Sequence, residues 1–150
     1  GQGIFLCRSE DSNANVAFEL LSHNETRHVV IQKAIPDAQV GDKRILLLNG
    51  EPLGAVLRVH GSRDHRNNFF AGGLPQATSI SNRDLDIVTT LKPHLQNLGL
   101  YFVGIDVIGD YLIEVNVTSP TCMQEMNRLY QTRLEDRVLD WVEETLQTRR

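Results

Sequence analysis

Two pairs of apolar segments, each joined by a short polar turn, constrain the fold of this chain more than any other feature. Residues 44–48 and 53–59 flank Asn49-Gly50-Glu51-Pro52, and residues 101–108 and 112–117 flank Gly109-Asp110. Asn-Gly between apolar runs is typical of a β-hairpin, because both residues tolerate the positive φ angles of a tight turn. The sequence therefore predicts two hairpins, and with them an antiparallel sheet.

Helical patterns occupy much of the remaining chain. Ser81 and Asp84 have the spacing of a capping box at the start of a helix, and Gly99 provides its stop. The predicted apolar stripe of this helix is Leu85, Val88, Leu91, Leu95 and Leu98. Other expected elements are strands at 4–8 and 28–35 and helices that begin near Asn13 or Asn15, after Pro120 and near Thr132. Together they predict an α+β fold, an antiparallel sheet with helices packed on one side.

Composition excludes several classes of protein. The 150 residues carry a net charge of −4 and a pI near 5.7, which is not typical of a nucleic-acid binder held by bulk charge. No apolar run approaches the roughly 20 residues that cross a bilayer. Cys7 and Cys122 lie far apart, so neither a disulfide framework nor a cysteine-rich zinc site is indicated. We expect a single reduced, cytoplasmic domain with no nucleic-acid and no membrane partner.

The second predicted hairpin carries three polar side chains among apolar ones. Glu114 and Asn116 are two apart and share a face of their strand. Asp106 joins that face only if it pairs with Glu114, which a three-residue loop would allow and a two-residue turn would not. Hard oxygen ligands of this kind suit Mg²⁺ completed by phosphate and water. The alternative is the polar outer face of a half-exposed hairpin.

Basic residues gather in the sequence around a long stretch without periodic pattern. This stretch covers residues 60–78. Loops of such length in a compact domain are usually functional or disordered. We expect a lid loop over a site. The basic residues are Lys43, Arg44, Arg58, His60, Arg63, His65 and Arg66. They favour an anionic ligand, and a solvated charged loop is the alternative.

Hydroxyl groups follow the carboxylate strand directly, in Thr118-Ser119-Pro120-Thr121-Cys122. At a turn from strand to helix, such groups either cap the helix or hold an anion at its N-terminus. A catalytic thiol at Cys122 would need a histidine and an acid that the sequence does not identify.

Taken together, these motifs resemble the bacterial glutathione synthetase family of ATP-grasp ligases. The resemblance rests on residues 101–110 and on Glu114-Val-Asn116-Val-Thr-Ser-Pro-Thr-Cys122. Upstream, Gly41-Asp-Lys-Arg44, Asn49-Gly-Glu-Pro52, Arg58, Arg66-Asn-Asn68 and Ala71-Gly-Gly73 follow in the order of the family. It implies the C-terminal half of an ATP-grasp domain over residues 1–150. The N-terminal substrate domain and the first ATP-grasp half would lie outside the chain, so we expect the chain alone to be inactive.

The resemblance also implies a reaction and its partners. ATP and Mg²⁺, or Mn²⁺, would activate the carboxylate of γ-glutamylcysteine as an acyl phosphate, and glycine would displace phosphate to form glutathione. The complete enzyme would be a homo-oligomer. Another ATP-grasp carboxylate–amine ligase and a non-catalytic nucleotide-binding remnant stay open as alternatives.

Residue roles follow by the same resemblance. Asp106, Glu114 and Asn116 would hold the metal, and Arg44 and Arg58 would act in catalysis on phosphate or acyl-phosphate oxygens. ATP would be bound by Gly1, Gly3, Gln32, Lys33, Ala34, Ile35, Asp42 and Asn116, with Asp42 on the ribose. The substrate would meet Arg58, Arg66, Asn68, Gly72, Gly73, Ser119 and Thr121. Lys33-Ala34 departs from the family pattern beside the adenine.

Overall fold

A computed structural model describes residues 4–59 and 74–148 of the chain. It divides into two compact units, Gly1–Pro36 and Asp37–Arg150. Within the first unit the helix α1 (Ala14–Leu21) begins after Asn13, as predicted, and buries none of its residues. A short 3-10 helix, η1 (Pro36–Gln39), spans the boundary between the units.

The strands predicted at 4–8 and 28–35 are wrong, because the structure has no regular element there. A strand needs a neighbour that satisfies its backbone groups. Among the described residues, neither segment pairs with another, and the side chains of Val30 and Ile31 are 85% and 80% exposed. β-branched and apolar composition alone therefore did not make a strand here.

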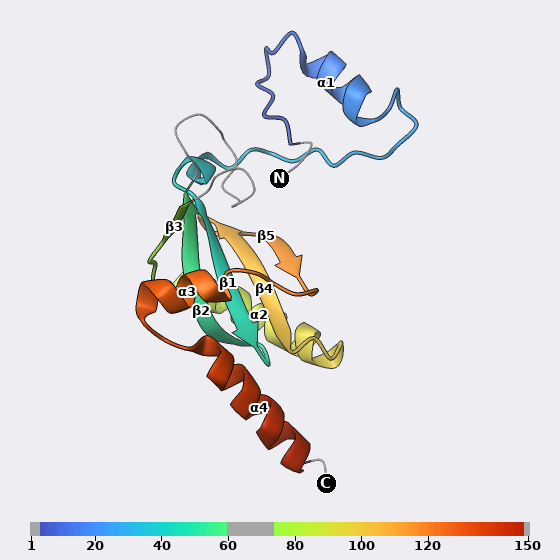
Figure 1. Ribbon diagram of the computed structural model, residues 1–150. Coiled ribbons are helices and arrows are strands. Elements are labelled where there is room, and N and C mark those ends of the chain that lie inside the picture. Colours follow the sequence, from blue (N-terminus) through green and yellow to red (C-terminus); the bar gives the residue numbers. More distant parts are fainter. Residues whose placement is uncertain (1–3, 60–73, 149–150) are drawn as a thin grey trace. The chain divides into compact units, whose positions relative to one another are not determined.

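The second unit is built on a five-stranded antiparallel sheet with the order β3-β2-β1-β4-β5 (Figure 1). Its strands are β1 (Asp42–Leu48), β2 (Glu51–Val59), β3 (Leu74–Gln76), β4 (Phe102–Ile108) and β5 (Tyr111–Asn116). Both predicted hairpins are confirmed. Asn49 and Gly50 take positive φ angles of 52° and 76°, as the tight turn between β1 and β2 requires.

The predicted lid loop differs from the structure at its C-terminal end. Residues 74–76 form β3, which pairs with β2 so that Val59 lies opposite Leu74. The preceding residues, 60–73, lie outside the described part of the chain.

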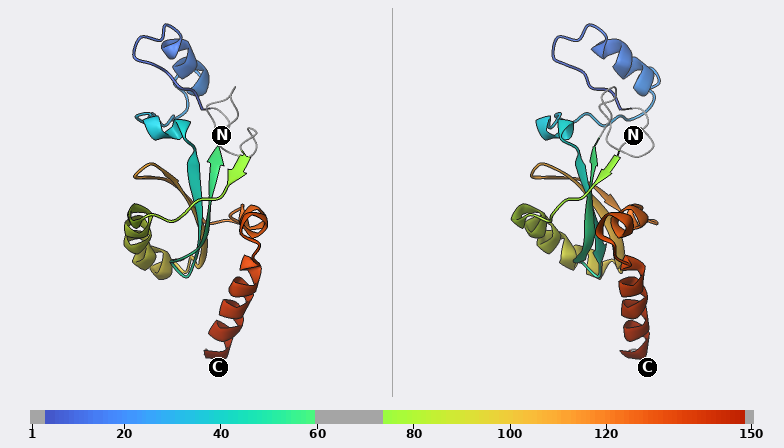
Figure 2. Two further views of the ribbon diagram at one scale, coloured as in Figure 1. Left: turned by 90° about the vertical axis from the view of Figure 1, so that its left-hand side faces the viewer. Right: turned by 60° about the vertical axis from the view of Figure 1, so that its left-hand side comes forward.

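Helices cover both faces of the sheet, so the prediction of helices on one side is wrong while the α+β class is confirmed. The helix α2 (Asn82–Asn97) lies on one face, and α3 (Met123–Tyr130) lies on the other (Figure 2). The following helix, α4 (Leu134–Thr148), joins α3 in packing through Leu134. The physical reason is the run Ile45-Leu46-Leu47, whose successive side chains point to opposite faces and are all fully buried.

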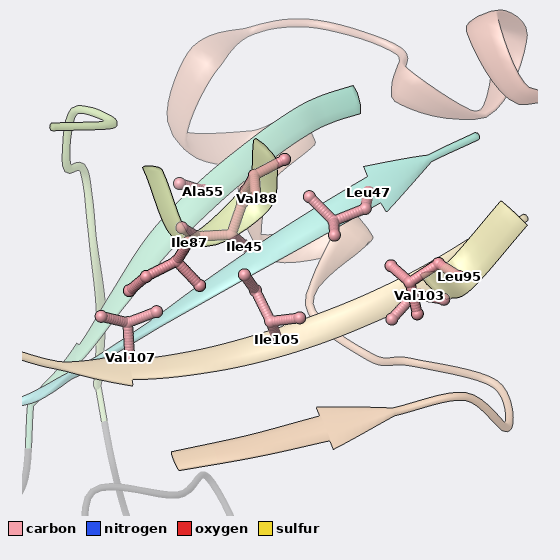
Figure 3. Packing of buried hydrophobic residues seen from close by; sticks show 9 residues of the cluster. All are labelled: Ile45, Leu47, Ala55, Ile87, Val88, Leu95, Val103, Ile105 and Val107. Carbon is pink, nitrogen blue, oxygen red and sulfur yellow. The ribbon is translucent and has the colours of Figure 1, made fainter. Parts of the chain in front are cut away.

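Each face has its own apolar cluster. Beneath α2 the cluster joins strand residues to Ile87, Val88 and Leu95 of the helix (Figure 3). Beneath α3 and α4 it contains Leu46, Leu53, Val56, Cys122, Met126 and Leu134.

The apolar stripe predicted for α2 is partly wrong. Its capping box between Ser81 and Asp84 is present, but Leu85 and Leu98 are exposed and Ile87 is buried instead. Leu98 is the C-cap residue and therefore lies past the last turn that faces the sheet. No helix among the described residues has the length and apolar character needed to cross a membrane.

We predict that Leu46→Ala lowers the free energy of unfolding by about 2–5 kcal/mol, because Leu46 is fully buried beneath α3 and its loss leaves a cavity. Leu139→Ala on α4 makes the same chemical change at a side chain that is 60% exposed, and should cost less than about 0.5 kcal/mol. Urea unfolding followed by circular dichroism measures both. Equal, small losses would show that this second face is not a packed core.

Candidate functional site

Asp106 on β4 lies opposite Glu114 on β5. Asn116, two residues after Glu114, lies opposite Gly104. The three polar side chains therefore belong to one face of the sheet, the α3 face. The prediction that this register needs a three-residue loop is wrong. The turn has only two residues, Gly109 and Asp110, and a bulge between Asp106 and Val107 supplies the missing one-residue shift.

Arg44 and Asp106 form a buried, two-pronged ion pair at the centre of this face. They lie opposite each other on β1 and β4. The Arg44 Nη2 donates to Asp106 Oδ2 at 2.9 Å, and Arg44 Nε donates to the other carboxylate oxygen. Their side chains are only 7% and 4% exposed. Two parallel charge-assisted hydrogen bonds fix the orientation of both groups.

Gly104 makes room for this arrangement. A Cβ at Gly104 would lie 2.8 Å from the Cβ of Pro120 and 3.3 Å from the Cδ of Arg44. Any larger residue would therefore push the Arg44 side chain or the segment after β5 away from the sheet. The nearby hydroxyl of Thr121 lies 3.5 Å from Arg44 Nη1, so this segment also meets the guanidinium.

Arg58 extends the pair into a chain of four charged groups. Its Nη2 lies 2.9 Å from Asp106 Oδ2, and its Nε donates to Asp42 Oδ1 at 2.7 Å. Asp42 and Arg58 are directly opposite each other on β1 and β2. The result is an alternating row of Arg44, Asp106, Arg58 and Asp42 across three neighbouring strands.

These contacts decide the ionisation of the row. Burial alone raises the pKa of Asp106, but hydrogen bonds from Arg44 and the charges of Arg58 and Arg44 outweigh it, so the pKa lies below the ordinary value for aspartate. Burial likewise lowers the pKa of Arg58, yet the bond to Asp42 and the charge of Asp106 leave that pKa above its ordinary value. Both groups are therefore charged at neutral pH.

The residues present fit a divalent cation beside this row. A carboxylate has about four lone-pair positions, and the arginines use three of them on Asp106, which leaves one for a metal. The exposed Glu114 can supply further oxygens from the edge strand. The side-chain Nδ2 of Asn116 is buried without a hydrogen-bond partner among the described residues, and amide O and N are interchangeable by a flip. A flipped Asn116 would place its oxygen where Nδ2 now lies, as a further ligand on the same sheet face.

No group of three His, Cys, Asp or Glu side chains forms a metal site within residues 4–59 and 74–148. A cation on this face would therefore depend on the amide of Asn116 as well as on the carboxylates. So few protein ligands suit a hard divalent cation that keeps open coordination positions, rather than a closed protein cage.

The remaining predicted site residues lie in the segment after β5, in the first unit, or outside the described part of the chain. Ser119 is exposed and has a positive φ of 47°, two residues before the Thr121 that meets Arg44. The predicted adenine segment, Gln32 to Ile35, is irregular chain in the first unit. Cys122 is buried, and burial raises the pKa of its thiol, which does not favour a nucleophile. Predicted residues outside the described part of the chain are Gly1, Gly3, Arg66, Asn68, Gly72 and Gly73.

The sequence interpretation missed the pairing of Asp42 with Arg58. The two-residue turn at Asn49-Gly50 alone would place Asp42 opposite Leu57, and a bulge between Leu46 and Leu47 shifts the register by one. The opposite charges of Asp42 and Arg58, on neighbouring strands of one hairpin, were the sequence signal that could have predicted this pair.

We predict that the Asp106 carboxyl titrates below the ordinary pKa of an aspartate, as measured by carboxyl ¹³C signals. Because its folded pKa is lowered, its stabilisation is present above the unfolded pKa of about 3.9 and is lost as the pH falls below it. Arg44→Gln should raise this pKa and destabilise the fold by about 3–5 kcal/mol. Arg83→Gln, which removes an exposed arginine bonded to the Asp110 carbonyl, should change neither value. An Asp106 pKa at or above the ordinary value for aspartate would contradict this geometry.

Comparison with known proteins assigns the family. The model of the prokaryotic glutathione synthetase ATP-grasp domain matches residues 1–131. The chain is 46% identical over 143 residues to glutathione synthetase of Synechocystis sp., covering 95% of this chain and 45% of the relative. It is 41% identical over 150 residues to the enzyme of Pseudomonas aeruginosa, covering 99% of this chain and 47% of that protein. The chain thus spans less than half the length of these curated relatives.

Among solved structures, D-alanine–D-alanine ligase from Bacillus anthracis complexed with ATP is similar, with a TM-score of 0.50 and 11% sequence identity. The likeness covers 87% of this chain and 46% of that ligase, and it shows a shared fold. The resemblance drawn from the sequence motifs is therefore confirmed, and the chain belongs to the family of prokaryotic glutathione synthetase ATP-grasp domains.

Proposed function

We propose that this chain supplies the metal- and phosphate-binding part of an ATP-dependent ligase that joins γ-glutamylcysteine to glycine, giving glutathione, ADP and phosphate. The observation that carries the proposal is the buried row of Arg44, Asp106 and Arg58 on the same sheet face as Glu114 and Asn116. Family membership supports the choice of reaction.

In this proposal Asp106, Glu114 and Asn116 hold Mg²⁺, for which Mn²⁺ can substitute. The cation, when bound, neutralises charge that develops on the phosphate oxygens during transfer. Asp106 is suited to the task because Arg44 and Arg58 keep it ionised and fixed. Glu114 lies on the edge strand, where its exposed carboxylate is accessible to a cation that arrives with ATP.

Arg44 and Arg58 are the proposed catalytic cations for phosphate and acyl-phosphate oxygens. Each uses its Nε and Nη2 on carboxylates, while Nη1 of Arg44 has, among residues 4–59 and 74–148, only the long contact to Thr121. Within the described part of the chain, the Nη1 groups are the donors that we propose for an anion. Because the guanidinium planes are already held, little rotamer entropy remains to be lost when the anion binds.

Other roles rest on family membership. We propose that Gln32, Lys33, Ala34 and Ile35 meet adenine mainly through backbone groups, and that Ser119 and Thr121 contact the peptide. Thr121 has geometric support, since its hydroxyl lies near the Arg44 guanidinium. We also propose a cytoplasmic homo-oligomer as the working enzyme, a setting consistent with the two free cysteines, Cys7 and Cys122.

The proposed reaction can be tested in a chimera that replaces the matching segment of the Synechocystis enzyme with this chain. Release of phosphate from ATP should require both γ-glutamylcysteine and glycine, and glutathione should form. Turnover with a different amine in place of glycine would indicate another carboxylate–amine ligase. A folded chimera that binds ATP without turnover would indicate a non-catalytic nucleotide-binding domain.

We predict that Glu114→Gln in this chimera lowers the rate of phosphoryl transfer by roughly 100-fold or more and weakens Mg²⁺ activation. The substitution keeps size and polarity but removes one negative charge from the proposed metal site. Asp110→Asn, in the adjacent turn, removes the same charge outside that site and should change the rate little. Equal losses in the two variants would mean that general acidity of the hairpin, and not a metal site, is responsible.

A further inference from the structure

Gly104 occupies the middle of the site face, at a position where a strand normally carries a side chain. It lies on β4 two residues before Asp106, between Leu46 of β1 and Asn116 of β5. Glycine weakens the interior of a strand and often marks the close approach of another group. Unlike Gly50, Gly104 has no positive φ angle. The backbone at Gly104 therefore accepts alanine, and space is the property that glycine provides here.

Two groups fill the space that Gly104 leaves open. A Cβ at this position would lie 2.8 Å from the Cβ of Pro120, and 3.3 Å and 3.5 Å from Cδ and Nη1 of Arg44. The arginine contacts require a shift of a few tenths of an ångström at most, whereas the proline contact is closer than real Cβ atoms approach. Arg44 is also held by both carboxylate oxygens of Asp106. A methyl group at Gly104 would therefore displace Pro120, and not Arg44.

Pro120 is one of two anchors of the segment that follows β5. The other anchor is Cys122, which is 3% exposed and belongs to the apolar cluster beneath α3. Thr121 lies between the two anchors, with its hydroxyl 3.5 Å from Arg44 Nη1. Because Thr121 directly follows Pro120 in the chain, a displaced proline moves that hydroxyl away from the guanidinium. Gly104 thus controls the distance between Thr121 and Arg44 through Pro120.

We propose that Gly104 is a positioning residue that holds the Thr121 hydroxyl beside Arg44. The inference rests on the proposed function, in which Arg44 binds phosphate oxygens and Thr121 contacts the peptide. In that reaction the acyl phosphate contains both parts, so its peptide end and its phosphate end must be held at a fixed separation. The contact of Pro120 with Gly104 fixes this separation. Its loss should weaken binding of the peptide and leave binding of ATP unchanged.

Steady-state kinetics of the chimera with the Synechocystis enzyme test this role. Gly104→Ala should raise the KM for γ-glutamylcysteine by about tenfold, the scale of one misplaced hydrogen bond, and change the KM for ATP by less than about twofold. Gly54→Ala is the matched control, because its added Cβ would lie 2.9 Å from Leu134 Cδ1 in the apolar cluster beneath α3 and α4. It should lower the stability and leave both KM values unchanged.

Two substitutions of Pro120 identify the contact that is responsible. Pro120→Gly removes the Cβ that meets residue 104, so Gly104→Ala should add little further loss in that background. Pro120→Ala keeps this Cβ, and there Gly104→Ala should cause the full loss. Equal losses in the two backgrounds would overturn the proposal. A KM for ATP that rises as much as the KM for the peptide would overturn it as well.

A measurement on the wild-type 150-residue chain needs no variant. A nuclear Overhauser effect should connect the Thr121 methyl group with side-chain protons of Arg44, because their polar groups lie 3.5 Å apart. Its absence would overturn the proposal even if Gly104→Ala does not fold. A wild-type chimera without turnover would instead mean that the proposed function fails, and the signal between Thr121 and Arg44 would persist in that case.

Discussion

A guanidinium and a carboxylate, those of Arg44 and Asp106, face each other across β1 and β4 with almost no exposure to water. Taking such charges out of water costs several kcal/mol for each ion, and a well-packed apolar pair is often equally stable. Further contacts help to offset this cost, since Asp106 also accepts from Arg58, and Arg58 in turn is held by Asp42. This arrangement is difficult to explain by stability alone, and it is well suited to binding an anion together with its cation.

Two β-bulges place these charges on one face. The bulge beside Leu46 turns Arg58 to the side that carries Arg44, and the bulge beside Asp106 does the same for Glu114. Removing either shift would move the affected side chain to the α2 face. The polar row therefore depends on two local irregularities in an otherwise regular sheet, which is typical of bulges near functional sites.

The sequence predicted much of this fold, and its errors have physical causes. The Asn49-Gly50 turn and the capping box at Ser81 are local features, so sequence patterns found them. Bulges and the burial of both sheet faces depend on packing between distant segments, and no local pattern fixes them. The apolar segment around Val30 shows the opposite error, because strand composition without a pairing neighbour does not form a strand. The role of Asp42 on the ribose was inferred from the family resemblance. Its pairing with Arg58 became apparent only from the strand register.

We propose above that this sheet face holds a divalent cation and a polyphosphate side by side. Anomalous scattering from Mn²⁺, in crystals of the chain grown with a non-hydrolysable ATP analogue, tests it most directly. We expect one strong peak within coordination distance of side-chain oxygens of Asp106, Glu114 and Asn116, with phosphate oxygens between that peak and Arg44. A peak elsewhere on the chain, or phosphate bound with Asp106 contacting only its arginines, would contradict the account.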